Sequence, residues 1–174
     1  NVTTCIECNK TVYLSDFLSL HSDLSESAAR ETAISALMNN VEVLSLFSKV
    51  RQLWKSDKQL LANYLFIKDG PLFFQAPFNK LVIPIRKFLA KAIENETPVF
   101  MIGQEKTGTF ASYLDMIKKD SRVFSYFILD DNFIHSQIQQ MRKWNYPYGM
   151  HTHFGSKIFV TGNTQNHLVV NIAT

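Results

Sequence analysis

The sequence is poor in glycine, proline and cysteine, and each shortage excludes a class of protein. Six glycines and five prolines among 174 residues are too few for a fibrous or linker-rich chain. Two cysteines do not make the disulfide framework of a small secreted domain, which favours a reducing cytoplasm. No apolar run approaches the roughly 18 residues of a membrane-spanning helix, so we expect no membrane partner.

Charged residues are scarce too, and neither sign dominates. Eighteen lysines and arginines stand against 15 acidic residues, and a net charge of +3 is too small to indicate a nucleic-acid partner by itself. Fourteen phenylalanines and 46% hydrophobic residues favour a folded globular chain over a disordered one. The length predicts one domain of about 150 residues or slightly more. The sequence starts at Asn1 rather than Met, which we interpret as a cut end.

A short N-terminal segment, residues 1–24, is predicted to form a unit of its own around Cys5 and Cys8. The Cys-x-x-Cys spacing places two thiolates on a tight turn, as in half of a zinc knuckle. A structural zinc ion needs four ligands, and the sequence has no second Cys-x-x-Cys pair. Two alternatives therefore stay open: a zinc site that other residues complete, or two buried or free thiols.

Helical and strand patterns alternate from Ser25 onward. The apolar periodicity through Trp54 predicts a long helix that ends near Ser56. Further helical patterns lie at 81–92, 110–117 and 134–141. Short apolar runs predict strands at 64–68, 99–102 (ending at Gly103) and 124–129, and two alternating segments predict a closing hairpin of 157–161 with 167–172. The expected fold class is α/β with an antiparallel pair at its end.

Asp69 and Glu42 are the first candidate site residues. Asp69 follows a predicted strand, and ligands of α/β sheets lie beyond the carboxyl ends of strands. The alternative is a turn aspartate, since Asp-Gly and Gly-Pro form turns. Glu42 is predicted to lie on the buried face of its helix, where a carboxylate is costly unless it binds a metal or pairs with Lys49 or Arg51. Two inward carboxylates suit Mg²⁺ or Mn²⁺.

Two later segments supply further candidates. Gly103–Gly108 follows a predicted strand and would present Lys106 to a phosphate, with a solvated turn as the alternative. His151 and His153 would share one face if they lay on a strand, and so could ligate a metal, although such pairs are more often surface or interface residues. Tyr148 offers a ring on which a nucleotide base could stack.

The order of these segments resembles the NurA family of prokaryotic nucleases, which process DNA double-strand breaks. The matching segments are Leu37–Leu44, Leu65–Leu72, Ile102–Gly108 and Tyr146–Gly155. The resemblance implies an RNase H-like mixed sheet flanked by helices and a Mn²⁺- or Mg²⁺-dependent nuclease of the 5′–3′ exonuclease and single-strand endonuclease type. It also implies DNA, a HerA-type hexameric ATPase and a second copy of the chain as partners.

The resemblance also assigns roles to residues of this sequence. It implies that Glu42 and Asp69 bind the metal, that Lys106 contacts a phosphate, and that His153 stands for a late family histidine. Further DNA contacts are expected from Lys80, Arg86 and Tyr148.

The family pattern includes one more carboxylate, on a first strand within an Asp-Gly-Ser-like motif. Nothing in residues 1–36 matches that motif, so residues 25–174 are predicted to be a NurA-like domain without its first strand, and 1–24 a subgroup insertion. Such sites hold two divalent ions about 4 Å apart, for which two carboxylates alone are too few. The alternatives are a non-catalytic module that binds DNA or an ATPase, and a zinc-stabilised regulatory domain.

Overall fold

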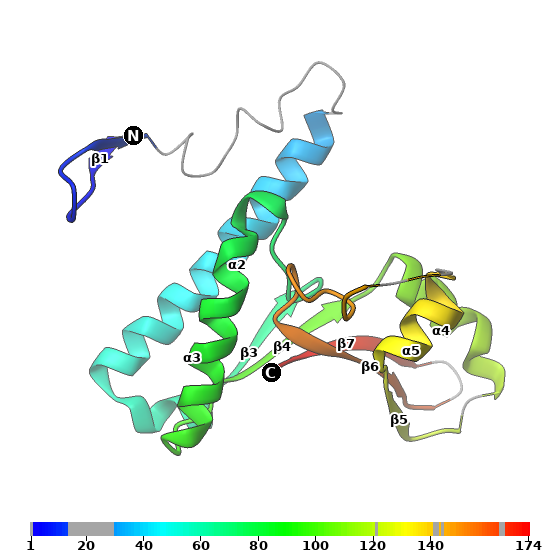
Figure 1. The fold of residues 1–174 in the computed structure, drawn as a ribbon. Coiled ribbons are helices and arrows are strands. Elements are labelled where there is room, and N and C mark those ends of the chain that lie inside the picture. The colour runs from blue at the N-terminus through cyan, green and yellow to red at the C-terminus, as the bar shows by residue number, and fades with distance from the viewer. Residues whose placement is uncertain (1, 14–29, 121, 141–142, 144, 164–165) are drawn as a thin grey trace.

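The structure is a computed structural model that describes the chain apart from residues 1, 14–29, 121, 141–142, 144 and 164–165 (Figure 1). Its strands are β1 (Val2–Thr4), β2 (Thr11–Tyr13), β3 (Leu65–Asp69), β4 (Phe100–Glu105), β5 (Ser125–Ile128), β6 (Gly155–Thr161) and β7 (His167–Ala173). Its α-helices are α2 (Arg30–Ser56), α3 (Val82–Glu94), α4 (Thr109–Ile117) and α5 (Asp131–Phe133), with shorter helical turns η1 (Lys58–Asn63), η2 (Ala76–Leu81), η3 (Lys118–Asp120) and η4 (Ile134–Ile138). Strands and helices alternate from β3 to α5, so the predicted α/β class is confirmed.

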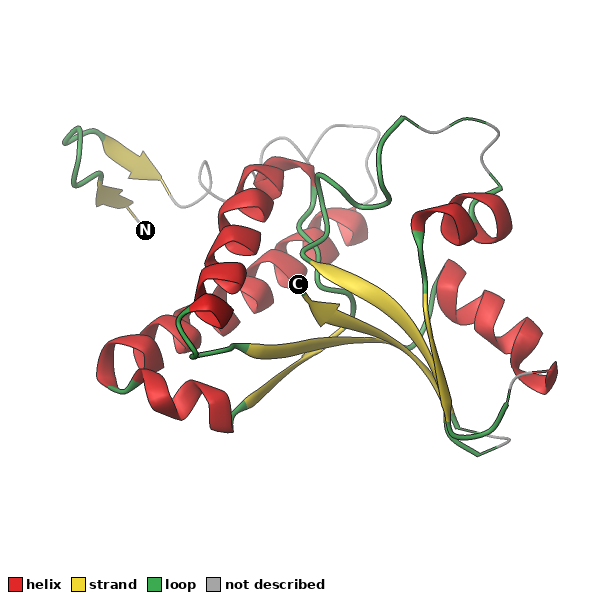
Figure 2. Cartoon of the chain, turned by 60° about the horizontal axis from the view of Figure 1, so that its bottom comes forward, coloured by secondary structure: helices red, strands yellow, loops and turns green. Residues whose placement is uncertain are grey.

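Five strands form a mixed sheet in the order β3-β4-β7-β6-β5 (Figure 2). β3 and β4 run parallel, and the other neighbouring pairs are antiparallel. The predicted closing hairpin is confirmed, because β6 and β7 pair from Gly155 opposite Ala173 to Thr161 opposite His167. β1 and β2 form a separate antiparallel pair. The unit predicted for residues 1–24 stays a prediction, since residues 14–24 lie outside the described part.

The helices cover one face of the sheet, in two apolar clusters. α2 and α3 pack with β4 around Val43, Val82 and Met101. α4 and η4 pack with β6 and β7 around Leu114 and Phe159. Figure 1 shows the same division, with α2 and α3 beside β3 and β4 and with α4 and α5 at the other end of the sheet. The predicted sheet flanked by helices is therefore confirmed, with its helices on a single face.

Two predicted element boundaries are wrong. The helix expected at 134–141 begins earlier, as α5, and continues as the π-helical turn η4, while Met141 lies outside the described residues. β4 does not stop at Gly103 but continues to Glu105. A β-carbon on Gly103 would lie 2.5 Å from the carbonyl oxygen of Gly70 and 3.1 Å from Leu72 Cγ. The glycine therefore permits close backbone approach inside a strand instead of ending the strand.

Replacing Gly103 by alanine is expected to lower the free energy of unfolding by about 2 kcal/mol, because the methyl group would press on main-chain atoms that cannot rotate away. Urea denaturation of the wild type and the Gly103→Ala variant measures the change. Equal stability of the two proteins would contradict the close approach of β4 to the Gly70 turn.

The opposite face of the sheet is apolar and stays open to solvent. Its exposed side chains come from β3, β4, β5 and β7 and are Leu65, Ile67, Phe100, Tyr126, Ile128, Leu168 and Ile172. None of the helices that the structure describes has the length and apolar character of a membrane span.

Candidate functional site

Glu42 and Asp69, predicted from separate segments of the sequence, line the same groove between α2 and β3. The groove has a volume of about 400 Å³ and is lined by Val41, Glu42, Ser45, Leu46, Lys49, Ile67, Lys68 and Asp69. α2 supplies one wall, and the carboxyl-terminal half of β3 supplies the other. The fold thus brings two carboxylates that are 27 positions apart in the chain to one groove.

The prediction that Glu42 lies on the buried face of its helix is wrong. Its side chain is 48% exposed at the groove, whereas the buried stripe of α2 runs through Val43 and Val50. The apolar neighbours that suggested burial include Met38, which is itself exposed. A carboxylate at this position keeps contact with water and is open to a cation from solution.

Lys68 connects the two carboxylate positions. Its Nζ lies 3.3 Å from the Glu42 carboxylate and donates a 2.9 Å hydrogen bond to the main-chain carbonyl of Asp69. The sequence offered Lys49 or Arg51 of the same helix as the alternative partner for Glu42, but the observed partner is Lys68 from the neighbouring strand. The Lys68 side chain is only 3% exposed, because successive side chains of β3 point to opposite faces and Lys68 points under the helices. A buried ammonium group needs such oxygen partners.

Lys106 reaches Asp69 from the next strand. Because β3 and β4 are parallel, with Asp69 opposite Gln104, their carboxyl ends meet at one edge of the sheet. Lys106 directly follows β4, and its Nζ lies 2.9 Å from the Asp69 carboxylate. Both side chains are exposed, so this ion pair adds little to stability and leaves both groups accessible to ligands.

The groove supplies part of a ligand set for a divalent cation. Mg²⁺ and Mn²⁺ prefer carboxylate and water oxygens, which fits the donors that Glu42 and Asp69 offer. Among the residues that the structure describes, no three His, Cys, Asp or Glu side chains gather into a group that could hold a metal ion. The groove contains Glu42 and Asp69, the same two carboxylates that the sequence singled out. A complete two-metal site needs at least one more.

Cys5 and Cys8 lie on the turn between β1 and β2. The backbone N–H of Asn9 donates a 2.9 Å hydrogen bond to the Cys5 carbonyl and closes the turn. Hydrogen bonds from the backbone of Cys8 and Glu7 lower the pKa of the Cys5 thiol, which favours the thiolate form that zinc binds. Neither cysteine forms a disulfide. Since the described residues bring no third ligand to them, the zinc site stays a prediction.

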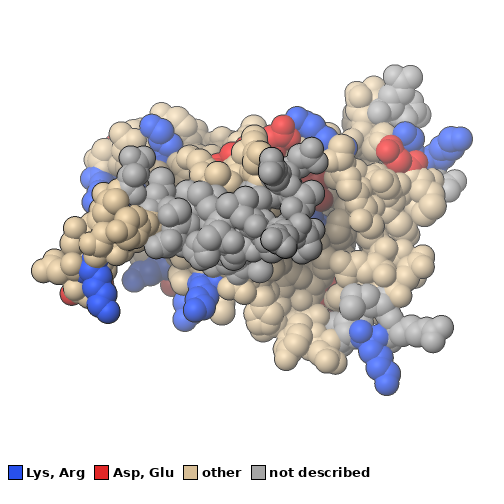
Figure 3. Space-filling view, turned by 90° about the horizontal axis from the view of Figure 1, so that it is seen from above, with Lys and Arg blue, Asp and Glu red and all other residues tan. Residues whose placement is uncertain are grey.

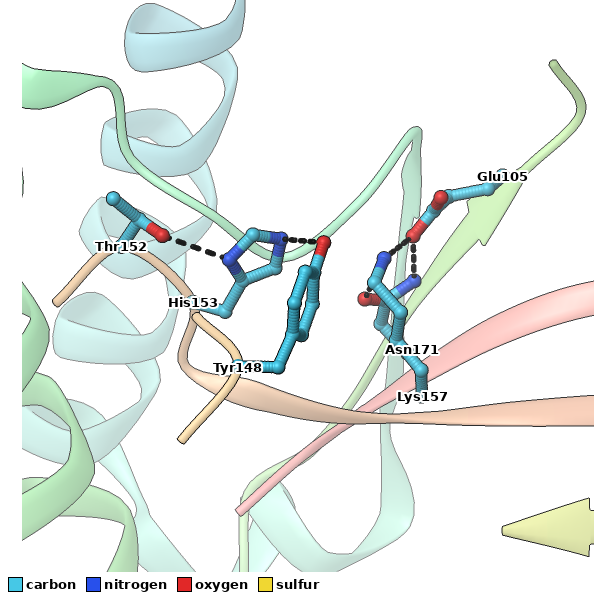
Figure 4. A network of polar contacts seen from close by, with 6 residues as sticks. All are labelled: Glu105, Tyr148, Thr152, His153, Lys157 and Asn171. Atoms are coloured by element: carbon cyan, nitrogen blue, oxygen red, sulfur yellow. Dashed lines mark hydrogen bonds and ion pairs between the residues drawn. The ribbon is translucent and has the colours of Figure 1, made fainter. Parts of the chain in front are cut away.

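A second polar cluster, which the sequence did not predict, lies on the helix-covered face of the sheet (Figure 4). Lys157 forms an ion pair with Glu105 and donates a 3.2 Å hydrogen bond to Asn171 Oδ1. Asn171 Nδ2 donates a 2.6 Å hydrogen bond to the same Glu105 carboxylate. The Lys157 ammonium also lies 4.4 Å from the centre of the Phe110 ring. All three polar side chains are buried, and burial lowers the pKa of Lys157 while Glu105 opposes that shift.

His151 and His153 do not lie on a strand, so the geometric basis for a His-x-His metal site is wrong. Both lie in a turn closed by 3.0 and 2.8 Å hydrogen bonds to the Gly149 carbonyl. The His151 side chain is exposed and packs against the Tyr146 ring at 5.6 Å. His153 is half-buried and stacks on Phe73 at 5.5 Å. The two rings therefore have different surroundings, as expected for independent roles.

His153 is held as a neutral ring between two hydroxyl groups (Figure 4). Its Nδ1 lies 2.9 Å from Thr152 Oγ1, and its Nε2 lies 3.4 Å from the Tyr148 hydroxyl. Burial, followed by the positive charges of Lys157 and Arg86, lowers the pKa of His153 from 6.5 to about 3. Burial and the charge of Glu105 raise the pKa of Tyr148, so its hydroxyl stays protonated. A neutral imidazole has one donor and one acceptor nitrogen, and hydroxyls satisfy both.

The depressed pKa of His153 predicts a loss of stability on acidification. The unfolded state takes up a proton below pH 6.5 while the folded state does not, so stability is fully present above pH 6.5 and falls toward pH 3. When the pH is lowered from 7.5 to 5, His153 should decrease the free energy of unfolding by about 2 kcal/mol. Urea denaturation of His153→Gln should show a change in the free energy of unfolding between these pH values that is smaller by this amount. The exposed control His151→Gln should show the same change as the wild type. Unchanged pH dependence in His153→Gln would contradict the assignment.

The predicted DNA contacts differ in accessibility. Arg86 is half-buried and donates a 2.7 Å hydrogen bond to the carbonyl of His153, so it fixes the turn that carries this residue. The Tyr148 ring packs against Phe110 at 5.3 Å and is not displayed for a nucleotide base. Lys80 is exposed. On the side shown in Figure 3, lysine and arginine side chains are dispersed instead of forming one basic patch.

A second groove, between α2 and α3, has a volume of about 410 Å³ and is lined by Leu44, Phe47, Val50, Arg51, Trp54, Lys55, Leu81, Pro84, Ile85 and Phe88. It carries no carboxylate, so it is not a candidate cation site.

The chain matches no family model, no curated protein and no solved structure. The functional assignment therefore depends on the geometry of the groove between α2 and β3.

Proposed function

We propose that the protein is a Mn²⁺- or Mg²⁺-dependent deoxyribonuclease of the 5′–3′ exonuclease and single-strand endonuclease type. The observation that carries this proposal is the convergence of Glu42 and Asp69 on one groove, with Lys68 and Lys106 in contact with them. These carboxylates come from separate segments of the NurA-like motif order. Their convergence is expected of metal ligands but is not required of a turn aspartate and a helix-surface glutamate.

Position gives each residue of the groove a different task. Asp69 and Glu42 would hold the cation, while buried Lys68 fixes the Glu42 carboxylate. Lys106, once released from Asp69, would bind a nonbridging oxygen of the DNA phosphate. Divalent ions in such sites lower the pKa of a bound water and stabilise the leaving oxygen. The exposed pair of Lys106 and Asp69 separates at little cost, which suits this exchange of partners.

A third carboxylate would complete the site, and the edge of β3 offers a place for it. β3 is the end strand of the sheet order, and the groove runs beside it. A strand added at this edge would bring its own side chains next to Asp69. The parallel pair beside the antiparallel β5-β6-β7 meander supports the RNase H-like arrangement that we infer.

The proposed partners are DNA and a HerA-type hexameric ATPase, in a cytoplasmic setting. The net charge of the chain is only +3, and its cations are dispersed on the side shown in Figure 3. Both features support DNA binding that is shared with a partner, because the partner would supply further contacts to the DNA phosphates. Zinc at Cys5 and Cys8 would stabilise the β1–β2 turn independently of the groove.

A non-catalytic module that binds DNA or an ATPase is the second candidate function. The observation that favours it is that lysines already neutralise both groove carboxylates. The third candidate, a zinc-stabilised regulatory domain, depends on Cys5 and Cys8 alone.

A cleavage assay with 5′-labelled single-stranded and double-stranded DNA separates these functions. The nuclease proposal predicts that Mn²⁺ converts the labelled strand into shorter labelled products. In EDTA the labelled strand should keep its full length. DNA binding without cleavage in Mn²⁺ or Mg²⁺ would support the binding module instead. A zinc measurement that finds no metal on the purified protein would remove the zinc-stabilised domain.

A further inference from the structure

Two adjoining cavities lie at the end of the sheet that α4 and α5 cover (Figure 1), and the proposed nuclease uses neither of them. The smaller cavity has a volume of about 210 Å³ and lies between η3 and the turn that joins β6 to β7. The larger cavity has a volume of about 440 Å³ and lies between α4, α5, β5 and β6. Arg122 and Thr161 line both cavities. Because β5 and β3 are the two edge strands of the sheet, these cavities lie across the sheet from the groove between α2 and β3.

The smaller cavity is basic. Among the described residues no carboxylate lines it, whereas four side chains that can carry a positive charge do: Lys118, Lys119, Arg122 and His167. The Asp115 carboxylate accepts a 3.0 Å hydrogen bond from Lys118 Nζ and lies 2.7 Å from His167 Nε2. One carboxylate neutralises at most one of these charges, so the cavity keeps a positive charge that suits a phosphoryl group. We call it the basic cavity.

The main chain at Arg122 is fixed to the neighbouring strands. Its carbonyl accepts 2.6 Å hydrogen bonds from the hydroxyl groups of Ser125 and Thr161. The N–H of Phe124 donates a 2.8 Å hydrogen bond to the carbonyl of Gly162. These bonds use main-chain atoms of the segment, and Arg122 itself is exposed. The arginine is therefore placed at the boundary of the two cavities, where it would contact a ligand that extends from one into the other.

Aromatic rings line the larger cavity, which we call the aromatic cavity. Phe127, Phe133 and Phe159 contribute the rings, and Leu114 and Ile117 of α4 complete the apolar lining. Phe127 is 49% exposed, and its ring packs against Phe133 at 5.0 Å. Planar nucleotide bases stack on such rings, which favours a base over an acyl chain as the occupant. A volume of about 440 Å³ lies within the range of small-ligand pockets, which begins at about 300 Å³.

We propose that the two cavities form one site for a free nucleoside 5′-phosphate, with the base in the aromatic cavity and the phosphoryl group in the basic cavity. The sugar would lie at the boundary, beside Arg122 and Thr161. The basic cavity has the volume of about seven waters at roughly 30 Å³ each, which is enough for a phosphoryl group. The proposal does not depend on nuclease activity, because nucleotide binding is measured without DNA or a divalent cation.

An NMR titration of the protein with adenosine 5′-monophosphate, in EDTA and without DNA, tests the site. The amides of Lys119, Arg122 and Phe127 are expected to shift, because these residues line the two cavities. Adenosine and inorganic phosphate, titrated separately, should each bind at least about tenfold more weakly than the nucleotide, since each fills only one cavity and loses the advantage of the covalent link.

Substitutions in each cavity separate the two contacts. Arg122→Gln should weaken binding of the nucleotide about tenfold, because it removes a charge from the phosphoryl contact. Phe127→Leu should weaken binding of the nucleotide and leave binding of inorganic phosphate unchanged. Lys58→Gln is the matched control: Lys58 is exposed on η1, outside both cavities, and this variant should bind the nucleotide like the wild type.

Circular dichroism shows whether each variant keeps its fold, and if Arg122→Gln does not fold, Lys119→Gln replaces it with the same expected loss. The absence of nucleotide-induced shifts in the wild type at millimolar concentration would overturn the proposal. Adenosine or inorganic phosphate that binds as tightly as the nucleotide would also overturn it, since only one cavity would then be used. A folded Arg122→Gln or Lys119→Gln variant that binds the nucleotide as well as Lys58→Gln would do the same.

Discussion

Replacing Asp69 by asparagine is expected to lower the rate of Mn²⁺-dependent DNA cleavage by on the order of 100- to 1,000-fold. Asparagine keeps the size of the side chain but removes the charge that would hold the cation. The fold should survive, because Asp69 is 72% exposed and its ion pair with Lys106 is also exposed. Initial rates on 5′-labelled single-stranded DNA, at saturating Mn²⁺, give the comparison.

A matched control separates loss of the site from loss of charge. Glu94→Gln removes an exposed carboxylate from α3, outside the groove, and should cleave DNA at the wild-type rate. Glu42→Gln should behave like Asp69→Asn, since both side chains line the groove. If Asp69→Asn, with its fold intact, cleaved as fast as Glu94→Gln, Asp69 would not be a metal ligand.

Removing one partner of the buried ion pair should have the largest effect on stability. Lys157→Met would leave the Glu105 carboxylate buried, with Asn171 as its remaining partner. We expect the free energy of unfolding to fall by about 3–5 kcal/mol, the usual cost of breaking a buried pair. Urea denaturation at neutral pH, followed by circular dichroism, measures the loss.

The double variant Glu105→Gln/Lys157→Met provides the internal control. It removes both charges, so no uncompensated ion stays in the interior, and it should be more stable than Lys157→Met alone. The exposed pair of Asp115 and Lys118 is the surface comparison, and Lys118→Met should cost less than about 1 kcal/mol. Equal costs at the buried and exposed sites would contradict the burial of the Glu105–Lys157 pair.

Periodicity predicted the elements of this fold well, because each depends on neighbours within one or two turns of chain. The long helix ending at Ser56 and the closing hairpin follow directly from apolar spacing. The end of β4 could not be predicted, because Gly103 is required by a contact with Gly70, 33 positions away in the chain. A glycine beside polar residues indicates a turn until the packing partner is known.

The groove was predicted in part. Asp69 and Glu42 stood out as single carboxylates at the end of a strand and on an apolar-looking helix, and the structure brings them together. Helical periodicity placed Glu42 on the wrong side, because the apolar stripe of α2 is broad and its edge lies along the groove.

The buried cations were missed for a different reason. Lys157 is the one charged residue of its strand, and Lys68 follows an apolar run, so each is a signal for an inward-facing ion. Their partners lie on other elements, and Glu105 is 52 positions from Lys157. No spacing rule within one element connects such residues, so only the paired sheet identifies the ion pair.

The central claim is that the groove between α2 and β3 binds a divalent cation, and Mn²⁺-induced broadening of amide NMR signals tests it most directly. Substoichiometric Mn²⁺ should selectively broaden the amides of Glu42, Asp69 and Gly70, and the Glu42→Gln/Asp69→Asn variant should lose this pattern. Broadening centred on another acidic site, such as Asp130 and Asp131, or the same pattern in the double variant, would contradict the account.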